Sequence, residues 1–152
     1  MIQSLDVNQA LADMTAQLQQ QLTAAGRTEV AMIGIRTGGV WLASALRERM
    51  QLAGPVGELD ISFYRDDFTR IGLNPTVKPS SLPFATDGRH LVLVDDVIMT
   101  GRTIRAVLNE LFDFGRPASI LLLTLLDIGS RELPVQPDVV GIKLSLQDNQ
   151  RV

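Results

Sequence analysis

Residues 91–103 read LVLVDDVIMTGRT, and this stretch decides the fold that we expect. The four apolar residues at its start, 91–94, are typical of a buried strand, and two carboxylates, Asp95 and Asp96, follow directly. The loop that comes next, residues 100–103, is rich in small residues and opens an amphipathic helix. A strand that ends in acids and turns through such a loop into a helix predicts an α/β unit. In such a unit, N–H groups and hydroxyls at the helix N-terminus can bind the phosphate of a sugar phosphate. The two carboxylates can accept hydrogen bonds from ribose hydroxyls or lie near a bound cation.

A simpler interpretation of the acid pair remains open at this point. Acids are common as turn or cap residues where strands end in α/β proteins, so Asp95 and Asp96 alone do not identify a site. However, an ionised carboxylate beside a buried strand is costly unless a cation, a hydroxyl or a basic side chain pairs with it. Arg102, at the start of the helix, is either such a partner, a ligand contact or an ordinary surface residue.

The composition limits the class of protein. A chain of 152 residues, 45% hydrophobic and 20% charged, suits one globular domain over residues 1–152. Cysteine is absent, which excludes disulfides and thiolate metal sites and favours a reducing, cytoplasmic environment. The N-terminus lacks the pattern of a signal peptide, and no apolar run is long enough to span a membrane. The formal charge of −3 argues mildly against a nucleic-acid-binding protein.

Hydrophobic periodicity predicts three helices and five strands along the chain. The helices are expected at residues 6–25, 40–50 and 102–114, and the strands at 29–35, 58–64, 91–94, 120–126 and 139–146. Ser4 or Asp6 can cap the first helix, and Gly26 can end it. Because the strands are continuously apolar and alternate with helices, we expect an α/β fold with a mainly parallel central sheet flanked by helices.

Ligands of such sheets bind beyond the carboxyl ends of the strands. Three loops are expected there, at residues 36–39, 95–103 and 127–131, and we expect them to converge on one rim. Residues 65–90 contain three prolines and show no periodicity, and compact domains seldom hold such a long structureless loop unless it is functional or disordered. We interpret this segment as a mobile flap near the site, with a plain solvated insertion as the alternative.

The stretch LVLVDDVIMTGRT resembles the phosphoribosyl pyrophosphate (PRPP) binding signature of type I phosphoribosyltransferases. Further segments are similar to one branch of that family, the pyrimidine operon regulatory proteins that are also uracil phosphoribosyltransferases. They are IGIRTGGVWLA at 33–43, GELDISFYRDD at 57–67, GRPASI at 115–120 and DIGSRELP at 127–134. The resemblance spans nearly all of residues 5–145 and implies a type I phosphoribosyltransferase-like fold.

The resemblance also implies a reaction, in which PRPP and uracil give UMP and pyrophosphate. It implies Mg²⁺ bound through PRPP rather than held directly by the protein, and a flap at 65–90 that closes over the site to exclude water. Arg36 would neutralise the pyrophosphate, and Ile128 and Gly129 would contact the base. The implied catalytic residues are Asp95, Asp96 and Arg65. The implied PRPP or nucleotide contacts are Thr37, Gly38, Gly39, Asp95, Asp96, Val97, Ile98, Met99, Thr100, Gly101, Arg102 and Thr103.

Two loops depart from the family pattern. The family usually has Thr-Arg-Gly where this chain has Gly38 as the second residue, and Asp-Arg-Gly-His-Arg where it has Ile128 and Ser130 as the second and fourth. Two hypotheses therefore stay open. The chain is either a PRPP-dependent uracil phosphoribosyltransferase or a regulator that binds UMP, UTP or PRPP with little or no turnover.

The resemblance bears on partners as well. In the family, a basic concave face that includes the first helix binds messenger RNA, but residues 1–26 here contain no Lys or Arg, two Asp and six Gln. Because RNA affinity draws on phosphate neutralisation by basic residues, we discount RNA binding. Family members form dimers or larger assemblies, so a homo-oligomer is expected. The family chain continues with a further strand, so we expect this domain to lack one.

Two single aromatic residues have structural interpretations: Trp41 as a core or subunit-contact residue, and His90 as a residue at the boundary of a strand.

Overall fold

The computed structural model describes residues 6–27, 30–61 and 81–144. Within these ranges it contains the three helices and five strands that the sequence predicts. The elements in chain order are α1 (Val7–Ala25), β1 (Val30–Ile35), α2 (Gly38–Met50), β2 (Gly57–Leu59), β3 (His90–Ile98), α4 (Arg102–Phe114), β4 (Ser119–Asp127) and β5 (Val139–Lys143). No helix in the described ranges combines the length and apolarity that a membrane crossing requires.

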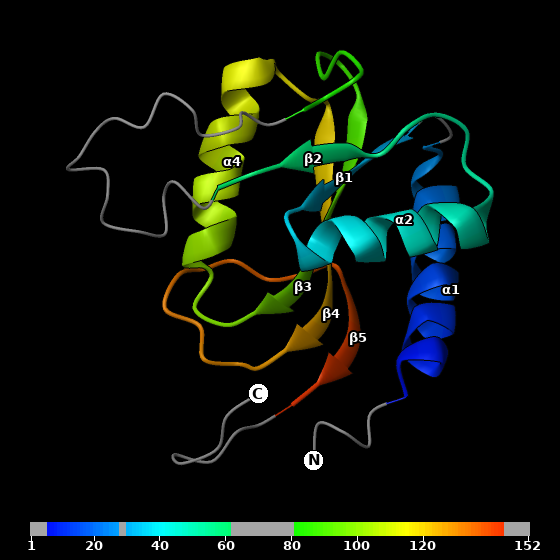
Figure 1. Cartoon of the computed structure of the whole chain (residues 1–152), viewed down its shortest axis with the longest axis vertical. Coiled ribbons are helices and arrows are strands. Elements are labelled where there is room, and N and C mark those ends of the chain that lie inside the picture. Colours follow the sequence, from blue (N-terminus) through cyan, green and yellow to red (C-terminus); the bar gives the residue numbers. More distant parts are fainter. Residues whose placement is uncertain (1–5, 28–29, 62–80, 145–152) are drawn as a thin grey trace.

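The five strands form one sheet in the order β2-β1-β3-β4-β5, and each neighbouring pair is parallel. The expected parallel α/β fold is therefore confirmed. Helices α1 and α2 cover one face of the sheet and α4 covers the other (Figure 1). Because all the strands run the same way, the loops that follow β1, β3 and β4 leave the sheet at one edge.

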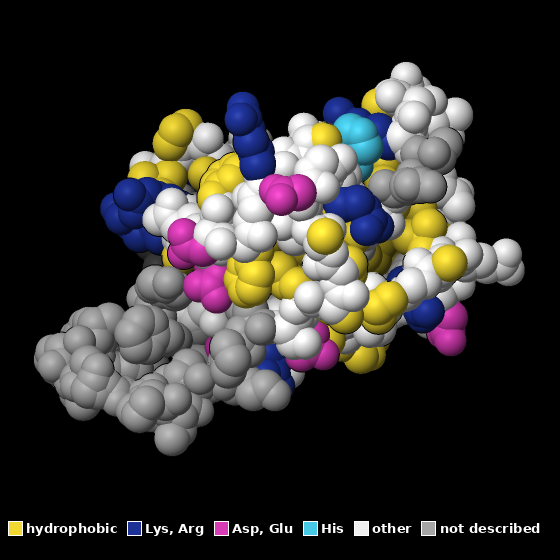
Figure 2. All heavy atoms as spheres, turned by 90° about the horizontal axis from the view of Figure 1, so that it is seen from above, with side chains coloured by type: hydrophobic (Ala, Val, Ile, Leu, Met, Phe, Trp, Pro, Cys, Tyr) yellow, Lys and Arg dark blue, Asp and Glu magenta, His cyan; other side chains and the backbone are white. Residues whose placement is uncertain are grey.

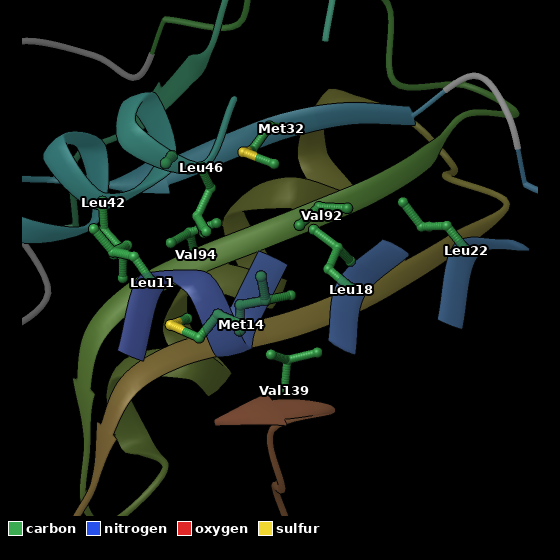
Figure 3. Packing of buried hydrophobic residues seen from close by; sticks show 12 residues of the cluster. Leu11, Met14, Leu18, Leu22, Met32, Leu42, Leu46, Val92, Val94 and Val139 are labelled. Carbon is green, nitrogen blue, oxygen red and sulfur yellow. The ribbon is translucent and has the colours of Figure 1, made fainter. Parts of the chain in front are cut away.

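Each face of the sheet carries its own hydrophobic core. On one face, Val92 and Val94 of β3 pack with residues of α1 and α2, among them Met14 and Leu18, whose side chains are completely buried (Figure 3). On the other face, Leu91 and Leu93 belong to the cluster formed with α4. Successive residues of a strand point to opposite faces, so a strand covered on both sides must be apolar throughout. This explains the continuous run at 91–94.

The ends of the first helix follow the prediction. The Asp6 side chain accepts a hydrogen bond from the Gln9 N–H at 3.0 Å, while Ser4, the alternative cap, lies outside the described residues. Gly26 ends the helix in the left-handed conformation, with φ of 70°, a region that glycine enters without steric cost. His90 opens β3 as expected, and its ring Nδ1 lies 2.6 Å from the Ser119 hydroxyl oxygen.

Several predicted boundaries and one of the two interpretations of Trp41 are wrong. β3 continues through the acid pair to Ile98, because its ladder with β4 is maintained there, with Asp95 opposite Thr124 and Ile98 opposite Asp127. β2 covers only Gly57–Leu59, and α2 begins two residues early, at Gly38. Trp41 is 58% exposed, so it is not a core residue, and its other interpretation, a subunit contact, stays a prediction.

The segment predicted as a flap is only partly described. Residues 62–80, and with them Arg65, lie outside the described ranges. At its far end, Ser81 forms an isolated antiparallel bridge with Glu58, through two hydrogen bonds of 2.8 Å. Leu82 and Phe84 then pack against the α4-side core. Residues 81–90 are thus attached to the sheet, and the alternative of a plain solvated insertion is wrong for them.

Candidate functional site

The turn after β1 lies directly against the end of β3. A Cβ atom added at Gly39 would overlap the Val94 carbonyl oxygen and lie 3.2 Å from the Asp95 Cα atom. A Cβ added at Gly38 would overlap the Asp96 carboxylate, 2.7 Å from its Cγ atom. Glycine at both positions therefore permits the turn to approach the acid pair closely. The expected convergence of the loops at 36–39 and 95–103 is confirmed.

The two carboxylates of the acid pair have different environments. Asp95 is only 4% exposed, and its Oδ1 atom accepts a hydrogen bond from the Asp96 N–H at 2.8 Å. Asp96 is exposed, and its Oδ1 atom accepts from the Val97 N–H at 2.9 Å. Each carboxylate thus accepts a hydrogen bond from the main-chain N–H of the residue that follows it in β3. These contacts leave the Asp96 Oδ2 atom facing Gly38 at the mouth of the site.

A pocket of about 220 Å³ lies beside this corner. Gly101 begins α4 with φ of 93°, and the Thr100 hydroxyl accepts a hydrogen bond from the Arg102 N–H at 3.1 Å. Because the first N–H groups of a helix have no partners within the helix, this end of α4 is suited to an anion. The lining residues are Asp95, Val97, Ile98, Met99, Thr100, Gly101, Thr103 and Ile104.

The two arginines predicted around this corner have acidic partners elsewhere. The Arg102 Nε atom lies 2.9 Å from the Glu132 carboxylate, and both side chains are more than half exposed, so its predicted pairing with Asp95 or Asp96 is wrong. Arg36 lies 3.5 Å from Glu58 and 3.9 Å from Asp60, with 40% of its side chain exposed. Ion pairs this exposed and this long are weak, so Arg36 can exchange its partners for a ligand.

The loop after β4 closes the same edge of the sheet. The Ile128 N–H donates to the Ile98 carbonyl at 3.1 Å, and the Gly129 N–H donates to the Asp127 carboxylate at 3.0 Å. The Ile128 side chain is 5% exposed. The third loop therefore converges with the other two, as expected. The N–H groups of the two residues predicted to contact the base are used inside the protein.

Arg131 holds this loop to the pocket at the start of α4, a role that was not predicted from the sequence. Its guanidinium forms two hydrogen bonds with the Asp127 carboxylate, at 3.0 and 2.9 Å, and donates to the Met99 carbonyl at 2.9 Å. Its Nε atom donates to the Gln136 side chain at 3.0 Å. The Asp127 and Arg131 side chains are only 6% and 15% exposed. The sequence signal for this ion pair was an acid and an arginine four residues apart, Asp127 and Arg131, at the end of a strand.

A second pocket, of about 290 Å³, lies at the ends of β4 and β5. It is lined by Asp127, Gly129, Arg131, Gln136, Lys143 and Leu144. Arg131 lines this pocket and also contacts Met99, which lines the first one. The carboxyl edge of the sheet therefore offers two adjacent polar pockets, one at a helix N-terminus and one with an exposed lysine.

Known proteins are similar in sequence to this chain along most of their length. The family model described as "Phosphoribosyl transferase domain" matches residues 2–152. A protein named "Bifunctional protein PyrR" from Pseudomonas paraeruginosa is 58% identical over 142 residues, which cover 93% of this chain and 84% of that protein. One of the same name from Pseudomonas fluorescens is 56% identical over 146 residues, covering 96% and 84%.

Solved structures with a similar fold are more distant in sequence. A hypoxanthine phosphoribosyltransferase from Staphylococcus aureus is 21% identical, with a TM-score of 0.71 and coverage of 94% of this chain and 77% of that one. A hypoxanthine-guanine phosphoribosyltransferase from Bacillus anthracis is 18% identical, with a TM-score of 0.73 and coverage of 93% and 82%. At this level of identity the likeness establishes the fold only.

Proposed function

Since the chain belongs to the phosphoribosyl transferase family, we propose that it transfers the phosphoribosyl group of PRPP to uracil, giving UMP and pyrophosphate. We further propose that it regulates pyrimidine synthesis in the cytoplasm through the uridine nucleotides it binds. One observation carries the proposal: the glycine turn after β1, the acid pair of β3 and the anion pocket at the start of α4 meet at one corner.

The phosphate group of PRPP would occupy the pocket of about 220 Å³. There it would accept hydrogen bonds from the first N–H groups of α4 and from the hydroxyls of Thr100 and Thr103. The positive end of the helix dipole favours the same anion. This assignment accounts for a glycine with positive φ at position 101, since a side chain there would be strained.

The acid pair would contact the ribose and stabilise the transition state. The bond from ribose C1′ to pyrophosphate breaks, the bond from C1′ to the uracil nitrogen forms, and that nitrogen loses its proton. While pyrophosphate departs, positive charge develops on the ribose ring, and a nearby carboxylate stabilises it. Asp96, which is exposed and faces the turn at Gly38, suits direct contact. Asp95 is buried and holds the Asp96 N–H.

Mg²⁺ would enter with PRPP. The ion prefers oxygen ligands and keeps several waters or substrate oxygens, so it needs few protein ligands. The Asp96 carboxylate, placed against the turn that would meet pyrophosphate, fits that requirement. When bound, the metal neutralises charge on the leaving pyrophosphate.

Uracil would occupy the neighbouring pocket of about 290 Å³. Because Ile128 and Gly129 use their N–H groups internally, the donors for the uracil carbonyl oxygens would come from Lys143 and Gln136. Of the two residues that the resemblance implies as base contacts, Gly129 lines this pocket and Ile128 does not. The Asp127–Arg131 pair would form the wall between the base and the phosphate.

The test is a radiometric assay of UMP formation from labelled uracil, PRPP and Mg²⁺. We expect uracil-dependent product and no product with hypoxanthine or guanine in its place. Calorimetry with UMP and PRPP accompanies it. Absence of UMP formation would reject the enzymatic proposal, and absence of nucleotide binding as well would reject the family site altogether.

A regulator with little turnover is the second candidate, and one observation favours it. The turn at residues 37–39 carries no basic side chain, and Arg36 beside it is paired with Glu58 and Asp60. Under this candidate Arg36 keeps these partners when the ligand binds, and pyrophosphate departure lacks its counter-charge. Under this candidate, UMP and UTP bind in calorimetry while the assay detects no UMP.

Two partner proposals accompany both candidates. We propose a homo-oligomer, which sedimentation velocity tests directly. We also propose that RNA is not the partner through α1, because Val7–Ala25 contains no basic residue. Retention of a pyrimidine-operon leader RNA on a filter by the protein, with or without UMP, would contradict that proposal.

A further inference from the structure

A third pocket, of about 210 Å³, lies at the opposite edge of the sheet, where the strands begin. Val30 opens β1 there, and Arg89 immediately precedes β3. The loop after α2 forms one wall, and Phe84 forms part of another. Figure 2 views this edge, and the cyan side chain is the chain's single histidine, His90, with Lys and Arg side chains near it. The pocket is therefore separate from the corner assigned to PRPP.

Two arginines line this pocket, and among its described lining residues none is acidic. The Arg47 Nε atom donates to the Gly54 carbonyl at 2.5 Å, which directs the guanidinium to the pocket wall. The Arg89 guanidinium lies over the Phe84 ring, 5.7 Å from its centroid, an arrangement that favours a fixed cation. Two positive charges thus face one small cavity.

Neither arginine has an acidic partner within the described part of the chain. The acid nearest to Arg89 in the sequence, Asp87, instead accepts a hydrogen bond from the Arg116 N–H at 2.6 Å. The Arg89 Nε atom is fully buried and has no hydrogen-bond partner among the described residues. A buried donor without an acceptor is costly, and such groups in native proteins call for an explanation. Because this Nε atom is not exposed to the cavity, a ligand there would meet the rest of the Arg89 side chain, which lines the pocket.

We propose that this pocket binds the phosphate group of a small phosphate monoester or a free phosphate ion. The charge of two guanidinium groups matches the charge of a phosphate dianion, and the planar donors of arginine suit its oxygens. A single carboxylate would neutralise only one of the two charges. The cavity of about 210 Å³ accommodates a phosphate with a short organic group. Because it lies at the amino edge, such a ligand would act on the protein from outside the proposed catalytic corner.

The test follows the NMR signals of the two arginine side chains during titration. The Nε–Hε signals of Arg47 and Arg89, recorded by proton–nitrogen NMR and assigned with R47Q and R89Q, are followed during titration with sodium phosphate. Sodium chloride at equal ionic strength is the reference, and glycerol 3-phosphate is the second titrant. We expect saturable shifts of both signals with phosphate and none with chloride. Tighter saturation by glycerol 3-phosphate would identify an ester as the ligand, and equal saturation would identify the phosphate group alone.

Arginine variants distinguish phosphate binding in the pocket from a general effect of the protein's charge. R89Q, followed at the Arg47 signal, and R47Q, followed at the Arg89 signal, should each weaken phosphate binding about tenfold or more, because each removes a charge-assisted hydrogen bond. Arg49 is exposed on the same helix and does not line the pocket, so R49Q should leave the affinity unchanged. Signals that do not move, or that move equally with chloride, would overturn the proposal. Equal weakening by R49Q would overturn it as well.

Discussion

Asp95 and Asp96 are adjacent in the chain but differ in what they can contact. Their side chains leave β3 on opposite faces, as neighbours on a strand do, so one is buried and the other meets solvent and Gly38. A substitution at Asp96 therefore probes ligand chemistry with little effect on folding. The same substitution at Asp95 would change both the ligand chemistry and the stability of the fold, because the Asp95 side chain is buried.

For this reason we predict that D96N lowers kcat/KM for PRPP by about 10²-fold, the loss expected when one electrostatic stabiliser of a transition state is removed. The free energy of unfolding should change by less than about 0.5 kcal/mol, because the side chain is exposed. Steady-state assays and urea unfolding measure the two quantities. D113N, on the exposed face of α4, is the matched control. An unchanged kcat/KM in D96N would show that Asp96 does not act on the reaction.

The two glycines of the turn should respond differently to alanine. In G39A the new methyl group meets the backbone of β3, which cannot move aside, so we expect a loss of about 2 kcal/mol or more of unfolding free energy. In G38A it meets the Asp96 side chain, which can rotate away. We therefore expect near-normal stability but reduced activity. Urea unfolding and the UMP assay measure both variants, and a G38A protein as unstable as G39A would contradict the assigned geometry.

Between elements, the Asp127–Arg131 pair links β4 to the loop that opens α4. Because both side chains are largely buried, R131M would leave the Asp127 carboxylate without its partner. We predict a loss of about 3 kcal/mol of unfolding free energy. R102M breaks an ion pair that is more than half exposed, and should cost less than about 1 kcal/mol. Urea unfolding of both variants tests the contrast, and equal losses would mean that burial does not determine the value of these pairs.

The strands and helices could be predicted because their signals are local. Apolar runs such as 91–94 predict a strand covered on both faces, and the 3.6-residue spacing of Leu11, Met14, Leu18 and Leu22 predicts the buried side of α1. The end of β3 could not be predicted. Its last residues include two acids, and they stay in the strand only because β4 pairs with them. Trp41 lies next to Leu42 in α2 and is 58% exposed, whereas Leu42 and Leu46 are buried, and the spacing alone does not separate it from them.

The sequence motifs of the candidate site could be predicted, but the side chains that its arginines contact could not. Asp95 and most of the loop at 97–103 line one pocket, as expected from a strand, turn and helix that are contiguous in the sequence. The contact of Arg131 with Met99 joins residues 32 apart, and the pairing of Arg102 with Glu132 joins residues 30 apart. Such pairs depend on the packed positions of two loops, so no local pattern contains them.

At the scale of the whole molecule, the parallel sheet separates the two proposed sites in space. Its carboxyl edge gathers three loops, the anion pocket and the acid pair, while its amino edge carries the arginine pocket. The two hydrophobic cores lie between these edges and include residues of β1 and β3 that reach from one edge towards the other. Ligands at the two edges should therefore both stabilise the same folded state, and variants at one edge should leave the response to a ligand of the other intact.

A thermal-shift panel tests this separation. A ligand that binds only the folded chain stabilises it by about 2.7 kcal/mol at a concentration of 100 Kd, which corresponds to a rise in Tm of about 5 °C or more for a chain of 152 residues. We predict such rises for PRPP, UMP and UTP with Mg²⁺, and much smaller ones for GMP and GTP.

The R47Q/R89Q variant should keep the rise with UMP, because its substitutions lie at the amino edge of the sheet. The G39A variant should lose it, because the new methyl group disturbs the acid pair. Equal rises with uridine and guanosine nucleotides would contradict a site selective for uracil, and loss of the UMP response in R47Q/R89Q would show that the two edges do not act independently.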